Sequence, residues 1–138
     1  MSKNVIDSEV KETYTRMTLN WCKDNLGIND RKRSELKLII RNIERKKGKY
    51  ILYGSYCFYK NRIVIYLPNC LTFYDIVSTV IHEYTHYLQS RTKYEMYQKT
   101  HFYSTNPLER QAKRNELKYT KVCLKEIRKL LRGQLILQ

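Results

Sequence analysis

One predicted helix, over residues 72–91, constrains the fold more than any other part of the chain. Apolar side chains surround most of this helix: Ile76, Val77, Val80, Ile81, Tyr84 and Leu88. A helix that is apolar on nearly all sides belongs inside a domain, so we expect it to be buried. Thr72 and Asp75 form a capping-box pattern that predicts where it begins.

His82, Glu83 and His86 interrupt this apolar helix. Residues four apart share a helix face, so both imidazoles can converge on one metal ion while Glu83 points beside it at a bound water. The alternative is a helix that carries two histidines by chance. Buried polar groups are costly without partners, and one metal ion satisfies all three residues together. The spacing therefore predicts a catalytic zinc site.

A catalytic zinc ion usually has three protein ligands, so a third must follow downstream. Glu109 lies twenty-two residues after His86, on the predicted core-facing side of the last helix. His101 lies fourteen residues after His86 in an aromatic segment. Both residues remain candidates from the residue pattern alone.

The ordered motifs RIVIYLP, STVIHEYTHYLQ and NPLERQA, over residues 62–112, resemble the gluzincin metallopeptidases, which include small bacterial and phage-encoded zinc peptidases. The resemblance covers roughly residues 62–116 and implies a minimal zincin-like domain. It implies Zn²⁺ on His82, His86 and Glu109, with Glu83 as the general base of peptide hydrolysis. His101 instead keeps open a resemblance to SprT-like zincins, which use three histidines and act on DNA-attached proteins.

The chain departs from the gluzincin pattern at Lys113, where many members carry an aspartate that orients a zinc histidine. The orienting carboxylate must therefore come from another position, and Asp75 and Glu116 are the candidates. Such enzymes also use a hydrogen-bond donor for the developing oxyanion. The sequence offers four possible donors without ranking them: Tyr94, Tyr97, His101 and Tyr103.

The 138 residues predict one α+β domain in which a small antiparallel sheet packs on the HExxH helix. We expect helices over about 8–25, closed by Gly27, and from Asp30 to about 46, so that residues 1–48 are helical. Residues 50–67 should form the sheet, with 62–67 as the edge strand that aligns a peptide substrate. Residues 92–106 read as an ordered loop or short irregular helix, and a long third-ligand helix should cover 107–132.

The formal net charge of +14 favours contact with polyanions such as nucleic acid or an acidic protein. Basic residues repeat every three or four positions on one side of the predicted last helix: Arg110, Arg114, Lys118, Lys121, Lys125, Arg128 and Arg132. A nucleic-acid-associated protein is therefore an alternative function, although a solvated amphipathic helix has the same pattern. A third alternative is a zinc-stabilised structural component of a larger assembly without turnover.

Four scattered cysteines, with no CxxC spacing, indicate reduced and mostly buried thiols. The first residues lack the apolar segment of a classical secretion signal, and no apolar run approaches membrane-spanning length. We expect a cytoplasmic protein, or one held in an assembly such as a virion, with no membrane partner.

Overall fold

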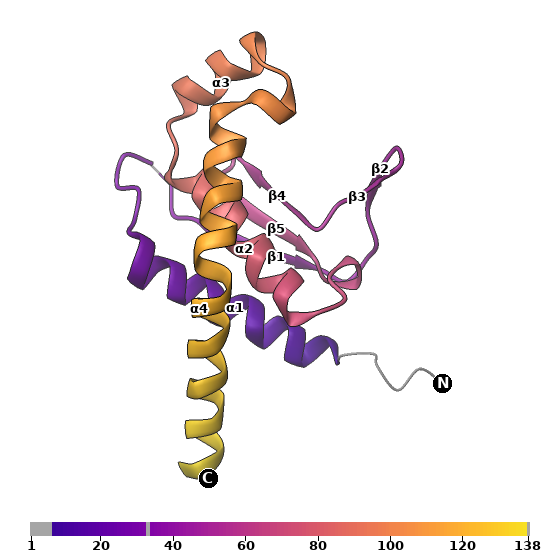
Figure 1. The fold of residues 1–138 in the computed structure, drawn as a ribbon, viewed down its shortest axis with the longest axis vertical. Coiled ribbons are helices and arrows are strands. Elements are labelled where there is room, and N and C mark those ends of the chain that lie inside the picture. The colour runs from indigo at the N-terminus through magenta and orange to yellow at the C-terminus, as the bar shows by residue number, and fades with distance from the viewer. Residues whose placement is uncertain (1–6, 33, 138) are drawn as a thin grey trace.

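The computed structural model describes residues 7–32 and 34–137, and it has the α+β class that the sequence predicts (Figure 1). Two short 3-10 turns cover Leu67–Asn69 and Tyr103–Thr105. The main elements in chain order are α1 (Ser8–Leu26), β1 (Lys37–Arg41), β2 (Lys46–Lys47), β3 (Tyr50–Ile51), β4 (Gly54–Cys57), β5 (Arg62–Tyr66), α2 (Phe73–Leu88), α3 (Arg91–Thr100) and α4 (Pro107–Leu137).

Helix α1 confirms the first predicted helix at both ends. The Asp7 side chain accepts a hydrogen bond from the backbone N–H of Glu9 and caps the first turn. Gly27 follows the last turn with a φ of 90°. Residues other than glycine rarely adopt this backbone conformation.

The helix predicted from Asp30 to about residue 46 is wrong, because residues 37–41 form strand β1. Leu36, Ile39, Ile40 and Ile43 recur at helical intervals, but a short apolar run fits a strand equally well. Here β1 pairs in parallel with β5, which buries part of Ile39 and Ile40, while Ile43 stays 56% exposed. Long-range strand pairing therefore outweighs the local helical periodicity.

The sheet is mixed rather than antiparallel, with the strand order β1-β5-β4. Strand β4 pairs antiparallel with β5, whereas β1 pairs parallel with its other side. Strand β3 lies outside this sheet and pairs with β2 in a separate hairpin. The prediction that residues 62–67 form the edge strand is therefore wrong: β5 is central, and β1 and β4 are the edges.

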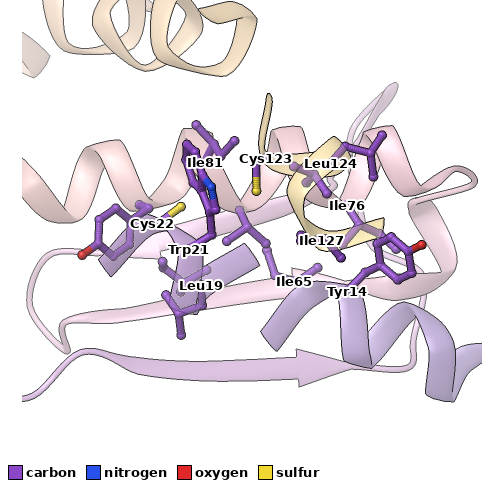
Figure 2. Close-up of a cluster of buried hydrophobic side chains, with 14 of the residues drawn as sticks. Tyr14, Leu19, Trp21, Cys22, Ile65, Ile76, Ile81, Cys123, Leu124 and Ile127 are labelled. Carbon is purple, nitrogen blue, oxygen red and sulfur yellow. The ribbon is translucent and has the colours of Figure 1, made fainter. Parts of the chain in front are cut away.

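The main core lies where α1, α2 and α4 meet one face of the sheet (Figure 2). Ile63 and Ile65 of β5 are fully buried, as are Ile76, Val77, Val80 and Ile81 of α2. Cys22 of α1 and Cys123 and Ile127 of α4 close the core from the helical side. Helix α2 is thus buried between sheet and helices, as its all-round apolar pattern predicts.

The segment after α2, predicted as an ordered loop or short irregular helix over residues 92–106, is mostly a regular helix, because α3 covers residues 91–100. Ser90 begins this helix by accepting a hydrogen bond from the backbone N–H of Lys93. Helix α4 begins at Pro107 as predicted and continues to Leu137, beyond the predicted end near 132. No helix within residues 7–32 and 34–137 combines the length and the apolar character that crossing a membrane requires.

Candidate metal centre

A capping box fixes the start of α2. The backbone N–H of Asp75 donates to Oγ1 of Thr72 at 3.0 Å, and the Asp75 carboxylate accepts from the N–H of Thr72 at 3.2 Å. The same carboxylate accepts from Leu71 N–H at 3.1 Å. Asp75 therefore completes the capping box that Thr72 begins, and other side chains must orient His82 and His86.

His82 and His86 of α2 meet Glu109 of α4. Nε2 of His82 lies 3.6 Å from Oε2 of Glu109, and Nε2 of His86 contacts Oε1 of the same carboxylate. All three side chains are largely buried, with exposed fractions between 8% and 16%. The structure therefore brings together the three residues that the gluzincin resemblance implies as ligands.

The first turn of α4 holds Glu109 in this position. The side chain of buried Asn106 accepts a hydrogen bond from Leu108 N–H at 2.9 Å and starts the helix. Ala112, one turn after Glu109, is fully buried. Its small side chain lets α4 approach α2 closely. A carboxylate in the first turn also interacts favourably with the positive end of the helix dipole.

Each imidazole is oriented from behind by a polar side chain. Oε1 of Glu116 lies 2.9 Å from Nδ1 of His82, and Oε1 of Gln89 lies 2.7 Å from Nδ1 of His86. These oxygens accept, so each Nδ1 is the donor, and in the neutral ring the lone pair of Nε2 points toward Glu109. Glu116 thus supplies the orienting carboxylate that Lys113 cannot.

The sequence reading missed Gln89. Its amide nitrogen donates to the backbone oxygen of Leu108 at 2.9 Å and to Oε1 of Gln111 at 2.8 Å. One buried side chain therefore ties His86 to the beginning of α4. Its place three residues after His86, at the end of the same helix, was the available signal.

The carboxylates change the acid–base properties of the histidines. Burial alone lowers the pKa of His82, but Glu109 and Glu116 outweigh it and raise this pKa to about 10. Burial likewise opposes the raised pKa of His86, for which Glu109 is the main cause. Burial would raise the pKa of Glu109, but the two imidazoles hold it well below its usual range. The cluster stabilises positive charge at the imidazole nitrogens, whether a proton or a metal ion carries it.

Glu83 lies beside the two histidines and is only 9% exposed. Ligand atoms of His82, Glu83 and His86 all lie within 4.8 Å of one another. Burial raises the pKa of Glu83 more than the two imidazoles lower it. A carboxylate in this setting binds a proton more readily than an exposed glutamate does, which suits a general base.

Among the four candidate oxyanion donors, the structure brings Tyr103 to the cluster. Tyr103 lines a cleft of about 390 Å³ together with His82 and Glu83. Desolvation of its hydroxyl and the nearby Glu109 carboxylate raise the pKa of Tyr103, which keeps the phenol protonated and able to donate.

The other three candidates have different surroundings. Tyr94 stacks on Phe58 with ring centroids 4.0 Å apart, and its hydroxyl accepts a hydrogen bond from Gln98. Tyr97 packs against His101 at the end of α3, with ring centroids 5.3 Å apart. His101 is exposed, and its backbone N–H closes α3 by donating to the oxygen of Tyr97 at 2.9 Å. His101 is therefore not part of the cluster.

The donor set fits a zinc ion. Two imidazole nitrogens and one glutamate oxygen, with an open fourth position, are a common catalytic zinc arrangement. Oε2 of Glu109 is buried without a hydrogen-bond partner among the described residues. Leaving a buried carboxylate oxygen unpaired costs on the order of 1–3 kcal/mol or more, and a cation held by the three side chains would remove that cost.

The predicted basic residues lie away from this cluster. All of them are exposed on α4: Arg110, Arg114, Lys118, Lys121, Lys125, Arg128 and Arg132.

Comparisons of the chain with protein-family models, curated proteins and solved structures find no match.

Proposed function

We propose that the protein is a zinc-dependent metallopeptidase. The observation that carries this proposal is the convergence of His82 and His86 on the carboxylate of Glu109, whose buried Oε2 has no hydrogen-bond partner among the described residues. These three residues would hold the ion. When bound, Zn²⁺ supplies Lewis acidity and lowers the pKa of a water molecule to near 7.

Glu83 is the proposed general base. It sits one residue after His82, beside both histidines and on the wall of the cleft, where it can take a proton from the attacking water and pass it to the departing amine. A purely structural zinc site closes its fourth position with a protein ligand and has no use for such a carboxylate. Glu83 therefore favours turnover over a structural role.

Tyr103 is the proposed donor to the oxygen that becomes negative as water adds to the peptide carbonyl. Tyr103 lines the same cleft as Glu83. Its raised pKa means that the phenol keeps its proton. A donor that meets the developing charge stabilises the transition state more than the bound substrate.

The edge strand β4 is the proposed guide for an extended peptide. Tyr53 and Gly54, at the start of β4, line the cleft that contains His82 and Glu83. In the described part of the chain β4 pairs only with β5, so its other edge can hydrogen-bond an added strand. We assign this role to β4 and not to the predicted edge strand over residues 62–67, because residues 62–66 form the central strand β5.

The test combines metal content with peptide hydrolysis. Zinc is measured by mass spectrometry after dialysis against a weak chelator, for the wild type, His86→Ala, Glu109→Ala and the control His101→Ala. A proteome-derived peptide library is then scored for new termini, with Glu83→Gln as the inactive variant. We expect one zinc per chain in wild type, Glu83→Gln and His101→Ala, and loss of zinc in the other two.

Cleavage should fall by at least about 100-fold in Glu83→Gln, the lower end of what a positioned general base contributes. Absence of zinc from the wild type would contradict the proposal. So would stoichiometric zinc with no cleavage, or cleavage that survives in Glu83→Gln.

A further inference from the structure

One exposed face of α4 carries only basic charge. The seven basic residues from Arg110 to Arg132 are spaced by four, four, three, four, three and four positions. At ~100° per residue this spacing keeps them within about 80° of helix circumference, in a straight row parallel to the axis. We call these seven residues the basic row.

The row has no acidic neighbours on its own helix, because all three glutamates of α4 are engaged elsewhere. Glu109 contacts the two histidines, and Glu116 contacts His82. Glu126 accepts a hydrogen bond from the indole N–H of Trp21 on α1. Between residues 107 and 134, none of the seven basic residues forms an ion pair with any part of the chain that the structure describes. The positive charge of the row is therefore uncompensated.

The row reaches past the body of the domain. Figure 1 shows α4 crossing α1 and continuing beyond it toward the C-terminus. Leu130 is 59% exposed, whereas Ile127 one turn before it is buried, so α4 has left the core by Leu130. From Arg110 to Arg132 the row is ~33 Å long, close to one turn of a nucleic-acid duplex at about 34 Å.

We propose that the basic row binds the phosphate backbone of double-helical nucleic acid. A regular row of seven arginine and lysine side chains of this length can contact several phosphates along one turn of a duplex. Protein interfaces have an apolar centre and are depleted of lysine, whereas the row consists only of lysine and arginine. Single-stranded nucleic acid is recognised by aromatic stacking, and the row contains no aromatic residue.

This inference does not depend on the proposed peptidase activity. Glu109 and Glu116 lie more than about 120° around α4 from the middle of the row. A duplex on the row would therefore leave the cleft with His82 and Glu83 open. The nucleic acid would then anchor the protein, and the site at His82, His86 and Glu109 would act on a different molecule.

The test compares two variants that lose the same charge. Lys121→Gln, Lys125→Gln and Arg128→Gln together remove three charges from the row. Lys46→Gln, Lys47→Gln and Lys49→Gln remove three exposed charges from the β2–β3 hairpin and its turn. Binding of fluorescent 20-base-pair DNA and RNA duplexes is measured by anisotropy between 50 and 200 mM salt, with polyglutamate as a second polyanion. Circular dichroism verifies that both variants are folded.

We expect the row variant to lose about tenfold or more in duplex affinity, and its salt slope to fall by about 2 to 3. The hairpin variant should keep most of the affinity and the slope. Preference for the DNA or the RNA duplex identifies the natural form of the partner. Equal losses in both variants would overturn the proposal, since net charge alone would then explain binding. Tighter binding of polyglutamate than of either duplex, or no duplex binding at 50 mM salt, would also overturn it.

Discussion

Oε1 of Glu116 lies 2.9 Å from Nδ1 of His82, so that α4 orients a histidine of α2 from the side opposite Glu109. Removing such an orienting partner typically weakens metal binding by about 10–100-fold. We predict this loss of zinc affinity for Glu116→Ala. Glu116→Gln should lose less, because an amide oxygen can still accept the hydrogen bond. Competition with a chromophoric chelator measures both affinities.

Glu95→Ala is the matched control for this experiment. Glu95 is a half-exposed glutamate that pairs with Arg91 on α3. Its removal should leave zinc affinity unchanged. If Glu116→Ala and Glu95→Ala bound zinc equally well, Glu116 would have no orienting role.

Gln89 has a double role, and its loss should lower both stability and metal affinity. The side chain is 5% exposed and bonds His86, the backbone of Leu108 and Gln111. We predict that Gln89→Ala lowers the free energy of unfolding by about 1–3 kcal/mol, because buried hydrogen-bond partners are left unpaired. Urea unfolding in the presence of a chelator measures this loss without any contribution from zinc.

Gln111→Ala separates the two roles of Gln89. Gln111 is exposed, and its substitution removes only one of the hydrogen bonds of Gln89. We therefore expect Gln111→Ala to lower the free energy of unfolding by less than about 1 kcal/mol and to leave zinc affinity unchanged. Equal zinc affinity in Gln89→Ala and wild type would show that His86 is oriented without Gln89.

The parts of the site that sequence reasoning predicted have local signals. The capping box of Thr72 and Asp75, the four-residue spacing of His82 and His86, and Pro107 at the start of α4 each lie within one turn of the feature that they predict. Glu109 was predicted by its apolar helix face together with the resemblance to gluzincins. The orienting role of Glu116 was left open beside Asp75, because only the contact across two helices distinguishes them.

The parts that were missed depend on contacts between distant segments. Strand β1 exists because residues 37–41 pair with residues 62–66, and its local periodicity looks helical. Gln89 bonds Leu108 and Gln111, nineteen and twenty-two residues away. Because β1 pairs with β5, β5 is a central strand and not the edge strand that the sequence predicted. Periodicity along the chain contains no information about such partners.

Gly54 allows α2 to pack on the edge of the sheet beside the cleft. A Cβ at this position would lie 2.8 Å from the backbone oxygen of Val64 and 2.8 Å from Cγ2 of Thr79. The backbone oxygen is held in the sheet and cannot move aside. We predict that Gly54→Ala lowers the free energy of unfolding by about 1–3 kcal/mol through this overlap, as measured by chemical denaturation.

Gly133→Ala is the opposite case and serves as the control. Within the described part of the chain, no atom lies within 4 Å of a Cβ at Gly133, which is inside α4. Alanine favours a helix over glycine by about 0.5–1 kcal/mol, so this variant should be slightly more stable than wild type. A Gly54→Ala protein as stable as Gly133→Ala would show that the sheet edge can relax.

The four free cysteines should differ in reactivity. Cys22, Cys70 and Cys123 are fully buried, whereas Cys57 on β4 is half-buried. Burial raises the pKa of the Cys70 thiol to about 11 and that of Cys123 to about 12, so both stay protonated near neutral pH. We predict that a chromogenic disulfide reagent at pH 8 modifies one thiol rapidly in the native protein and all four in denaturant. Rapid native reaction that persists in Cys57→Ser would contradict this assignment.

The raised pKa of Cys70 also predicts a loss of stability at alkaline pH. An unfolded thiol has a pKa of about 8.5, so above that pH the folded chain holds a proton that the unfolded chain releases. The free energy of unfolding should therefore fall between about pH 8.5 and 11, with Cys70 contributing up to ~1.4 kcal/mol per pH unit. Urea midpoints at pH 8, 9 and 10, in a phosphine reductant, should fall less steeply for Cys70→Ala than for wild type. Parallel pH dependence in the two proteins would show that Cys70 is not the group that releases the proton.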